Sequence, residues 1–179
     1  MKLLKKLLAF MILLFLLACG YLGYKGYQEY ETALSAMSME EMEQKIQSIG
    51  NYTKLEDLPE TYVKAVLAVE DKRFYRHFGI DLIATCRALV NDIKAMAPVE
   101  GGSTITQQLA KNQYFSQEKK VTRKIAELFM AFKMEQSFTK DQILEMYVNS
   151  IFFGNNYYCV GDASIGYFGK LPAQMNDDE

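Results

Sequence analysis

The sequence has few of the residue types that build most zinc sites. It contains one histidine, His77, and three cysteines, Cys19, Cys86 and Cys159, which lie far apart. No Cys-x-x-Cys pair and no cluster of cysteine with histidine occurs, so we expect no metal site from these side chains. An odd number of cysteines without a pairing pattern also argues against a disulfide framework. We therefore predict three unpaired thiols.

Strong net charge, strand-like patterns and repeats are lacking as well. The formal net charge is −2 at pH 7, which gives no general reason to expect a nucleic-acid partner. No segment alternates convincingly between apolar and polar residues. The 179 residues are 50% hydrophobic and 23% charged, as expected for one globular domain with a real core. Helical periodicities dominate, so the predicted fold class is mainly α.

The N-terminus begins with a basic segment that is followed by a long apolar stretch. Three lysines lie within residues 1–6, and no charged residue occurs over residues 7–24. At ~1.5 Å per residue this stretch forms about 27 Å of helix, just enough to cross a bilayer. The lysines predict a cytoplasmic tail over 1–6, a transmembrane anchor over 7–24 and an extracytoplasmic remainder. We expect a single-pass protein of the cell membrane.

Two other interpretations of the apolar stretch stay open. It could be a signal peptide that is removed. The sequence LLACG, residues 16–20, also looks like a lipoprotein processing site at which Cys19 would be lipidated. All three interpretations place residues 30–179 outside the cytoplasm, at or near a membrane surface.

Helix signals organise the rest of the chain. Residues 25–54 are rich in helix formers but weakly periodic, which predicts a connector with a helical stalk that ends near Gly50. Pro59 suits the first turn of a new helix. Thr139 with Gln142 is typical of a capping box. We predict helices over residues 60–78, 81–96, 104–112, 121–136 and 139–150, with a break at 97–103.

Glu70 is the first candidate functional residue. On the predicted helix it lies on the same apolar stripe as Leu67, Phe74 and His77. Apolar surroundings raise the pKa of a carboxylate, and such a group can act as a general base near neutral pH. The alternative is a glutamate that is exposed at a helix end or pairs with Arg73. For His77, the favoured interpretation is a core-facing ring that bonds a backbone carbonyl.

Residues 101–112, GGSTITQQLAKN, form a second candidate site. A Gly-Gly-Ser turn that opens a helix presents free N–H groups to which an anion can bind. Thr104 with Gln107 is typical of a capping box, and Lys111 lies two turns further on. The alternative is an ordinary capped helix.

Residues 123–127, RKIAE, form a third candidate site. Glu127 lies one turn from both Arg123 and Lys124. This pattern suits a basic cluster that binds a phosphate-bearing substrate. The alternative is a solvated helix face whose ion pairs contribute only tenths of a kcal/mol.

Five segments together carry a resemblance to a known family. They are, in order, EDKRFYRHFG, GGSTITQQLAKN, RKIAE, KDQILEMYVN and the stretch from Gly154 to Lys170 that ends in YFGK. They look like the five signature motifs of the peptidoglycan glycosyltransferases. This family polymerises lipid II and supplies the glycosyltransferase module of class A penicillin-binding proteins, or stands alone as a monofunctional enzyme. The resemblance covers roughly residues 55–179.

The resemblance implies roles for individual residues. Glu70 would be the catalytic base that takes the proton from the 4-hydroxyl of the acceptor lipid II. This oxygen attacks the anomeric carbon of the growing glycan strand, and a lipid pyrophosphate leaves. Glu127 would be the second acidic residue of the site. The residues implied to hold the site or bind substrate are Asp71, His77, Ser103, Thr104, Gln107, Gln108, Lys111, Arg123 and Lys124.

The resemblance also implies a fold and partners. The fold would be a lysozyme-like helical lobe with a small membrane-proximal jaw, formed largely by residues 80–102. Ile80, Ile83 and Met96 would be candidates for lipid contact, with core packing as the alternative. Some family members use a divalent metal, Mg or Mn, at the pyrophosphate, although the sequence shows no dedicated ligand cage. A separate transpeptidase would be needed to cross-link the product.

One departure from the family pattern keeps other functions open. The family's domain usually continues for several helices after the YFGK motif, so residues 55–179 are expected to be a glycosyltransferase domain that is incomplete at its C-terminus. An inactive remnant that binds lipid II or cell-wall partners is therefore an alternative. A lysozyme-like enzyme that cleaves finished glycan is a further one.

Overall fold

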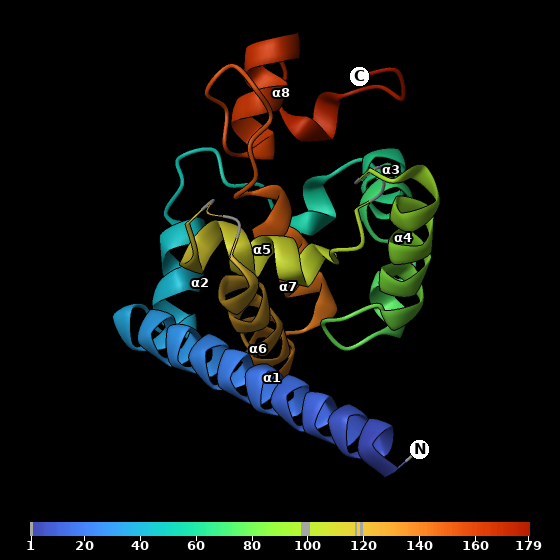
Figure 1. The fold of residues 1–179 in the computed structure, drawn as a ribbon. Helices are drawn as coiled ribbons and strands as arrows, with labels where there is room; N and C mark the ends of the chain where they lie inside the picture. Colours follow the sequence, from blue (N-terminus) through green and yellow to red (C-terminus); the bar gives the residue numbers. More distant parts are fainter. Residues whose placement is uncertain (1, 98–100, 117, 119) are drawn as a thin grey trace.

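The computed structural model describes residues 2–97, 101–116, 118 and 120–179. This part of the chain is helical without any strand, which confirms the predicted mainly α class (Figure 1). The α-helices are α1 (Lys2–Ala36), α2 (Met39–Gln47), α3 (Glu60–Glu70), α4 (Leu82–Ala95), α5 (Ile105–Tyr114), α6 (Val121–Ser137), α7 (Lys140–Val148) and α8 (Val160–Phe168). Short 3₁₀ turns lie at Leu55–Asp57, Phe74–Arg76 and Pro172–Gln174.

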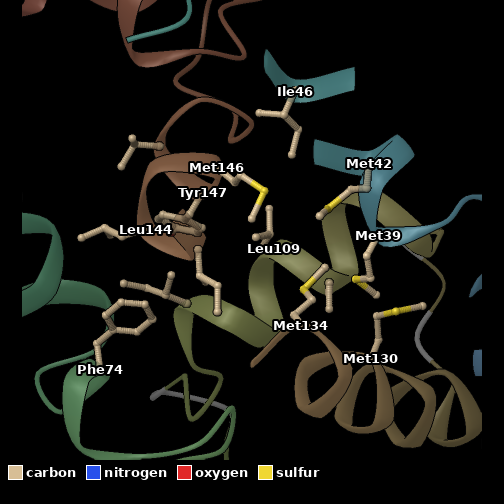
Figure 2. Close-up of a cluster of buried hydrophobic side chains, with 14 of the residues drawn as sticks. Met39, Met42, Ile46, Phe74, Leu109, Met130, Met134, Leu144, Met146 and Tyr147 are labelled. Carbon is tan, nitrogen blue, oxygen red and sulfur yellow. The ribbon is translucent and has the colours of Figure 1, made fainter. Parts of the chain in front are cut away.

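The core forms where α2, α6 and α7 surround α5. Side chains from all four helices meet there, and many of them are methionines (Figure 2). Methionine is unbranched and flexible, so it fills the irregular space between helices that cross at different angles. The core side chains that are almost completely buried include Met39, Met42, Ile46, Leu109, Met130, Met134, Leu144 and Met146.

Helix α1 joins the predicted anchor to the predicted stalk without a break. It is long and apolar enough to cross a membrane, with a mean hydropathy of 2.3 over its most apolar 18 residues. Its C-terminal half packs on α6, as Figure 1 shows. The backbone at Gly26 lies against Ile125, and the rings of Tyr27 and Tyr30 lie 5.4 and 5.9 Å from the ring of Phe129.

The segment predicted as a connector packs as part of the domain. In α2, Met39, Met42 and Ile46 are buried at helical spacing and complete the core. Ser38 starts this helix with a capping box closed by Glu41. The prediction missed this role because the apolar positions are separated by charged residues, and only three of them face the core.

Helix α3 is shorter than predicted. The sequence predicted a helix from residue 60 to 78, but α3 ends at Glu70. Asp71 leaves the helical conformation because its buried carboxylate accepts hydrogen bonds from two tertiary partners, the Ile105 N–H and the His77 ring. The chain then makes a 3₁₀ turn that places Phe74 in the core.

The other predicted helices are confirmed to within a few residues. Both predicted capping boxes are present, at Thr104 with α5 and at Thr139 with α7. The predicted break at 97–103 falls partly on residues 98–100, which lie outside the described residues. Helix α8 was not predicted, because its sequence reads as a turn rich in glycine and aromatic residues.

Candidate active site

A cleft of about 640 Å³ opens between the C-terminus of α3, the N-terminal half of α4 and the N-terminus of α5. Most of the residues that line it are polar, and they carry charges of both signs. Seven of the eleven predicted site residues line it: Glu70, Asp71, Ser103, Thr104, Gln107, Gln108 and Lys111. Segments that are far apart in the sequence therefore meet at one place.

Glu70 is exposed to solvent in this cleft. The prediction that it lies in apolar surroundings is wrong, because α3 ends at this residue and turns the side chain toward the opening. Its Oε2 accepts a hydrogen bond of 2.8 Å from the amide of Gln108. The alternative of a glutamate exposed at a helix end is confirmed. Its pairing with Arg73 is not formed, since Arg73 binds Asp81 instead.

Tyr147 orients the amide that holds Glu70. Its hydroxyl donates a hydrogen bond of 3.1 Å to Gln108 Oε1, which leaves the amide nitrogen of Gln108 to donate to Glu70. Burial raises the pKa of Tyr147, and the charge of Glu70 raises it further, so the hydroxyl stays a donor. Sequence analysis did not identify Tyr147, because nothing in the local sequence signals this contact.

Asp71 and His77 form a buried pair behind the cleft. His77 Nε2 lies 2.9 Å from Asp71 Oδ2, which also accepts the Ile105 N–H at 3.1 Å. The predicted bond from His77 to a backbone carbonyl is therefore replaced by one to a carboxylate. Among the described residues, the buried His77 Nδ1 has no hydrogen-bond partner. The pair attaches the residue after Glu70 to the start of α5.

Side chains at the N-terminus of α5 form hydrogen bonds with the backbone of the same segment. Thr104 Oγ1 accepts from the Gln107 N–H and donates to the carbonyl of Gly79 at 2.7 Å. Gln107 Oε1 accepts the Thr104 N–H at 3.0 Å. Both residues are buried, so they build the wall of the cleft. Ser103 lies just before them and accepts a hydrogen bond of 2.8 Å from Lys124.

Glu127 is buried beneath two cations. Its carboxylate accepts from Lys124 Nζ at 3.0 Å and from Arg123. Burial lowers the pKa of Lys124, and the neighbouring charges of Arg123 and Lys111 lower it further. Lys124 reaches the cleft through Ser103, whereas Arg123 lines a separate cavity of about 1060 Å³ beside α1. The structure therefore brings Lys111 and Lys124 near each other and directs Arg123 elsewhere.

Arg73, Asp81 and Arg87 also line the cleft, and sequence reasoning did not predict them as site residues. Arg73 donates two hydrogen bonds, of 2.6 and 2.8 Å, to Asp81. Asp81 in turn caps α4 by accepting the Ala84 N–H. The guanidinium of Arg73 lowers the pKa of Asp81 to about 2. This pair fixes the start of α4 beside the loop that follows Glu70.

The carboxylates of the cleft do not fit a metal cage. In the described part of the chain, no group of three or more His, Cys, Asp or Glu side chains could hold a metal ion. Glu70, Asp71 and Asp81 each accept hydrogen bonds from other groups. A metal that arrives with a pyrophosphate stays a prediction, and no step below depends on one.

Comparisons with known proteins match this chain to one family. The transglycosylase family model matches residues 36–179. Penicillin-binding protein 1A of Neisseria gonorrhoeae is 49% identical over 119 residues, which cover 66% of this chain and 15% of that protein. Penicillin-binding protein 1A of Vibrio cholerae is 47% identical over 117 residues, which cover 65% of this chain and 14% of that protein. The matched segment is thus a small part of these relatives. Since the family model covers more than half of the chain, the chain belongs to the transglycosylase family.

Proposed function

We propose that the chain is a peptidoglycan glycosyltransferase that polymerises lipid II into glycan strands. The observation that carries this proposal is the exposed carboxylate of Glu70 in a cleft that cations also line. The family match and the likeness to the penicillin-binding proteins 1A support the same class of reaction.

In the proposed reaction Glu70 is the general base. Gln108 holds one carboxylate oxygen, Oε2, and leaves Oε1 for the acceptor. The acceptor's 4-hydroxyl oxygen forms a bond to the anomeric carbon of the growing strand, while its proton moves to Glu70. The bond from that carbon to the lipid pyrophosphate breaks, and the bonding electrons leave with the pyrophosphate.

Cations near the cleft would stabilise the charge that develops on the pyrophosphate. Lys111 lines the cleft and forms no ion pair within the described residues. Lys124 lies next to it, held by Ser103 and Glu127. Because the Glu127 carboxylate is buried and bonded to two cations, we assign it the role of holding them. Direct participation of Glu127 in the reaction, as the second acidic residue of the site, stays a prediction.

The lipid of the substrate requires the cleft to lie near a membrane. The N-terminal half of α1 is apolar and exposed along its length, as a bilayer anchor would be. Helix α4, one wall of the cleft, also exposes large apolar side chains. They are Leu82, Ile83, Leu89, Val90, Ile93 and Met96. We assign this face to contact with the bilayer, as the jaw of the family would have.

The test is polymerisation of labelled lipid II by the detergent-purified chain and by its Glu70→Gln variant. The matched control is Glu60→Gln, which changes an exposed glutamate at the other end of α3. We expect glycan from the unmodified chain and from Glu60→Gln, and at least about a hundredfold less from Glu70→Gln. Lipid II binding without glycan, or soluble fragments released from purified cell wall, would instead support the binding remnant or the glycan-cleaving enzyme.

A further inference from the structure

The N-terminus of α7 contacts the loop that follows Glu70. Lys140 Nζ lies 4.3 Å from the centre of the Phe74 ring, over its face. One residue on, Asp141 accepts a hydrogen bond of 2.8 Å from the hydroxyl of Tyr75. Two neighbouring residues of α7 thus hold two neighbouring residues of the loop.

Lys140 is itself fixed by a largely buried ion pair. Its ammonium lies 2.7 Å from Glu135 Oε1, which also accepts a hydrogen bond of 2.6 Å from Thr106. The side chain of Glu135 is only 3% exposed and that of Lys140 19%. The ammonium therefore has a defined position between α5, α6 and the loop. An attraction between a cation and a ring is strongest where water is excluded in this way.

Phe74 connects Lys140 to the residues that lie behind the cleft. Its ring is 1% exposed and meets the ring of His77 edge to face, with centroids 6.2 Å apart. His77 bonds Asp71, and Asp71 directly follows Glu70. A series of direct contacts thus links Lys140 to the residue beside the carboxylate in the cleft.

We propose that Lys140 is a positioning residue for Glu70, which acts by holding the 71–77 loop through the ring of Phe74. This inference rests on the proposed function of Glu70. The physical reason is that a catalytic carboxylate displaced by about 1 Å can lose on the order of a hundredfold in rate. The loop is short, so a shift of Phe74 moves Asp71 and the end of α3 with it.

The first test compares Lys140→Met with Lys140→Arg in the full chain. Lys64→Met is the control, because it removes an exposed lysine of α3 that pairs with Glu60 and, within the part of the chain that the structure describes, has no ion pair or hydrogen bond to the loop. We expect Lys140→Met to lower kcat for glycan synthesis about tenfold to a hundredfold, with less than about a twofold change in KM. Lys140→Arg keeps a cation over the ring and should recover most of kcat. Unchanged kcat in folded Lys140→Met overturns the proposal, and so does a change confined to KM.

A second readout does not depend on activity. His77 is the only histidine of the chain, so its imidazole NMR signals report on the loop without overlap. In Lys140→Met these signals should shift or broaden, and in Lys64→Met they should stay as in the unmodified chain. Unchanged His77 signals in Lys140→Met overturn the proposal. If the unmodified chain makes no glycan, the proposed function fails, while the His77 signals still test the contact.

Lys140→Met leaves Glu135 buried without its cation, and this variant can fail to fold for that reason alone. The double variant Glu135→Gln, Lys140→Met removes both charges and avoids the problem. Phe74→Leu keeps an apolar side chain in the core but removes the ring. Both should lower kcat and move the His77 signals while the chain stays folded. If both retain full activity and unchanged signals, Lys140 has no positioning role.

Discussion

The close contact between α1 and α6 can be tested at a single glycine. A Cβ atom on Gly26 would lie 2.5 Å from Cγ2 of Ile125 and 2.9 Å from the carbonyl oxygen of Thr122. Neither distance is tolerated, so α1 or α6 must shift when alanine replaces this glycine. Gly23 lies one turn earlier on the same helix, and a Cβ there would meet nothing within 4 Å. The two positions form a matched pair.

The magnitudes follow from two opposing effects. Alanine in place of glycine favours a helix by about 1 kcal/mol. Overpacking a close contact costs about 1–3 kcal/mol. Gly23→Ala should therefore raise the free energy of unfolding by up to about 1 kcal/mol. Gly26→Ala should have no net benefit or lower it, so that the two variants differ by about 1–3 kcal/mol.

The assay is unfolding of the detergent-solubilised chain by denaturant, followed by far-ultraviolet circular dichroism. The near-ultraviolet signal comes mainly from tyrosines, since the chain has no tryptophan, and Tyr27 and Tyr30, which pack against Phe129, contribute to it. It should change in Gly26→Ala and not in Gly23→Ala. Equal stabilisation by both substitutions would refute the close packing of α1 on α6.

Three further predictions concern the cleft. Asp81 has its pKa lowered to about 2 by Arg73, below the ordinary value of about 3.9, so the stability that this pair provides is present above about pH 4 and is lost as the pH falls toward 2. The pair contributes about 2 kcal/mol in full to the free energy of unfolding, and part of this is lost between pH 6 and pH 3. Unfolding measured at these two pH values should show that Asp81→Asn removes that part of the acid sensitivity. Tyr147→Phe frees the amide of Gln108 to turn away from the base and should lower kcat about tenfold at unchanged KM, as steady-state kinetics with lipid II would measure. Glu127→Gln leaves two cations without their buried partner and should lower the free energy of unfolding by about 3 kcal/mol in a denaturant titration.

Most of the fold could be predicted from the sequence because its helix signals are local. The capping boxes at Thr104 and Thr139 and the apolar stripes of α6 and α7 depend on neighbouring residues alone. The end of α3 could not be predicted in this way. It depends on Asp71, whose partner Ile105 lies 34 positions further along the chain. Periodicity continued past Glu70, and tertiary hydrogen bonds overrode it.

Part of the candidate site could also be predicted from the sequence, and part could not. Motif resemblance predicted seven of the residues that line the cleft, including Glu70, Gln108 and Lys111, but not Arg73, Asp81 or Arg87. It did not predict their surroundings, so Glu70 was expected among apolar side chains and is exposed. The roles of Tyr147 and Lys140 also escaped sequence reasoning, because each depends on a contact between helices. Such contacts leave no local pattern in the sequence.

The unbroken course of α1 has a geometric consequence for how the domain meets a bilayer. Since α1 runs for 35 residues as one helix, about 52 Å long, it joins the proposed anchor to the domain without a break in the helix. One residue inserted between Tyr24 and Gly26 would turn the cleft about this helix by ~100° and raise it by ~1.5 Å. Insertion of seven residues, about two full turns, would return the cleft to within about 20° of its original direction but lift it by about 10 Å. The helical register of α1 thus encodes both the direction in which the cleft faces and its height above the anchor.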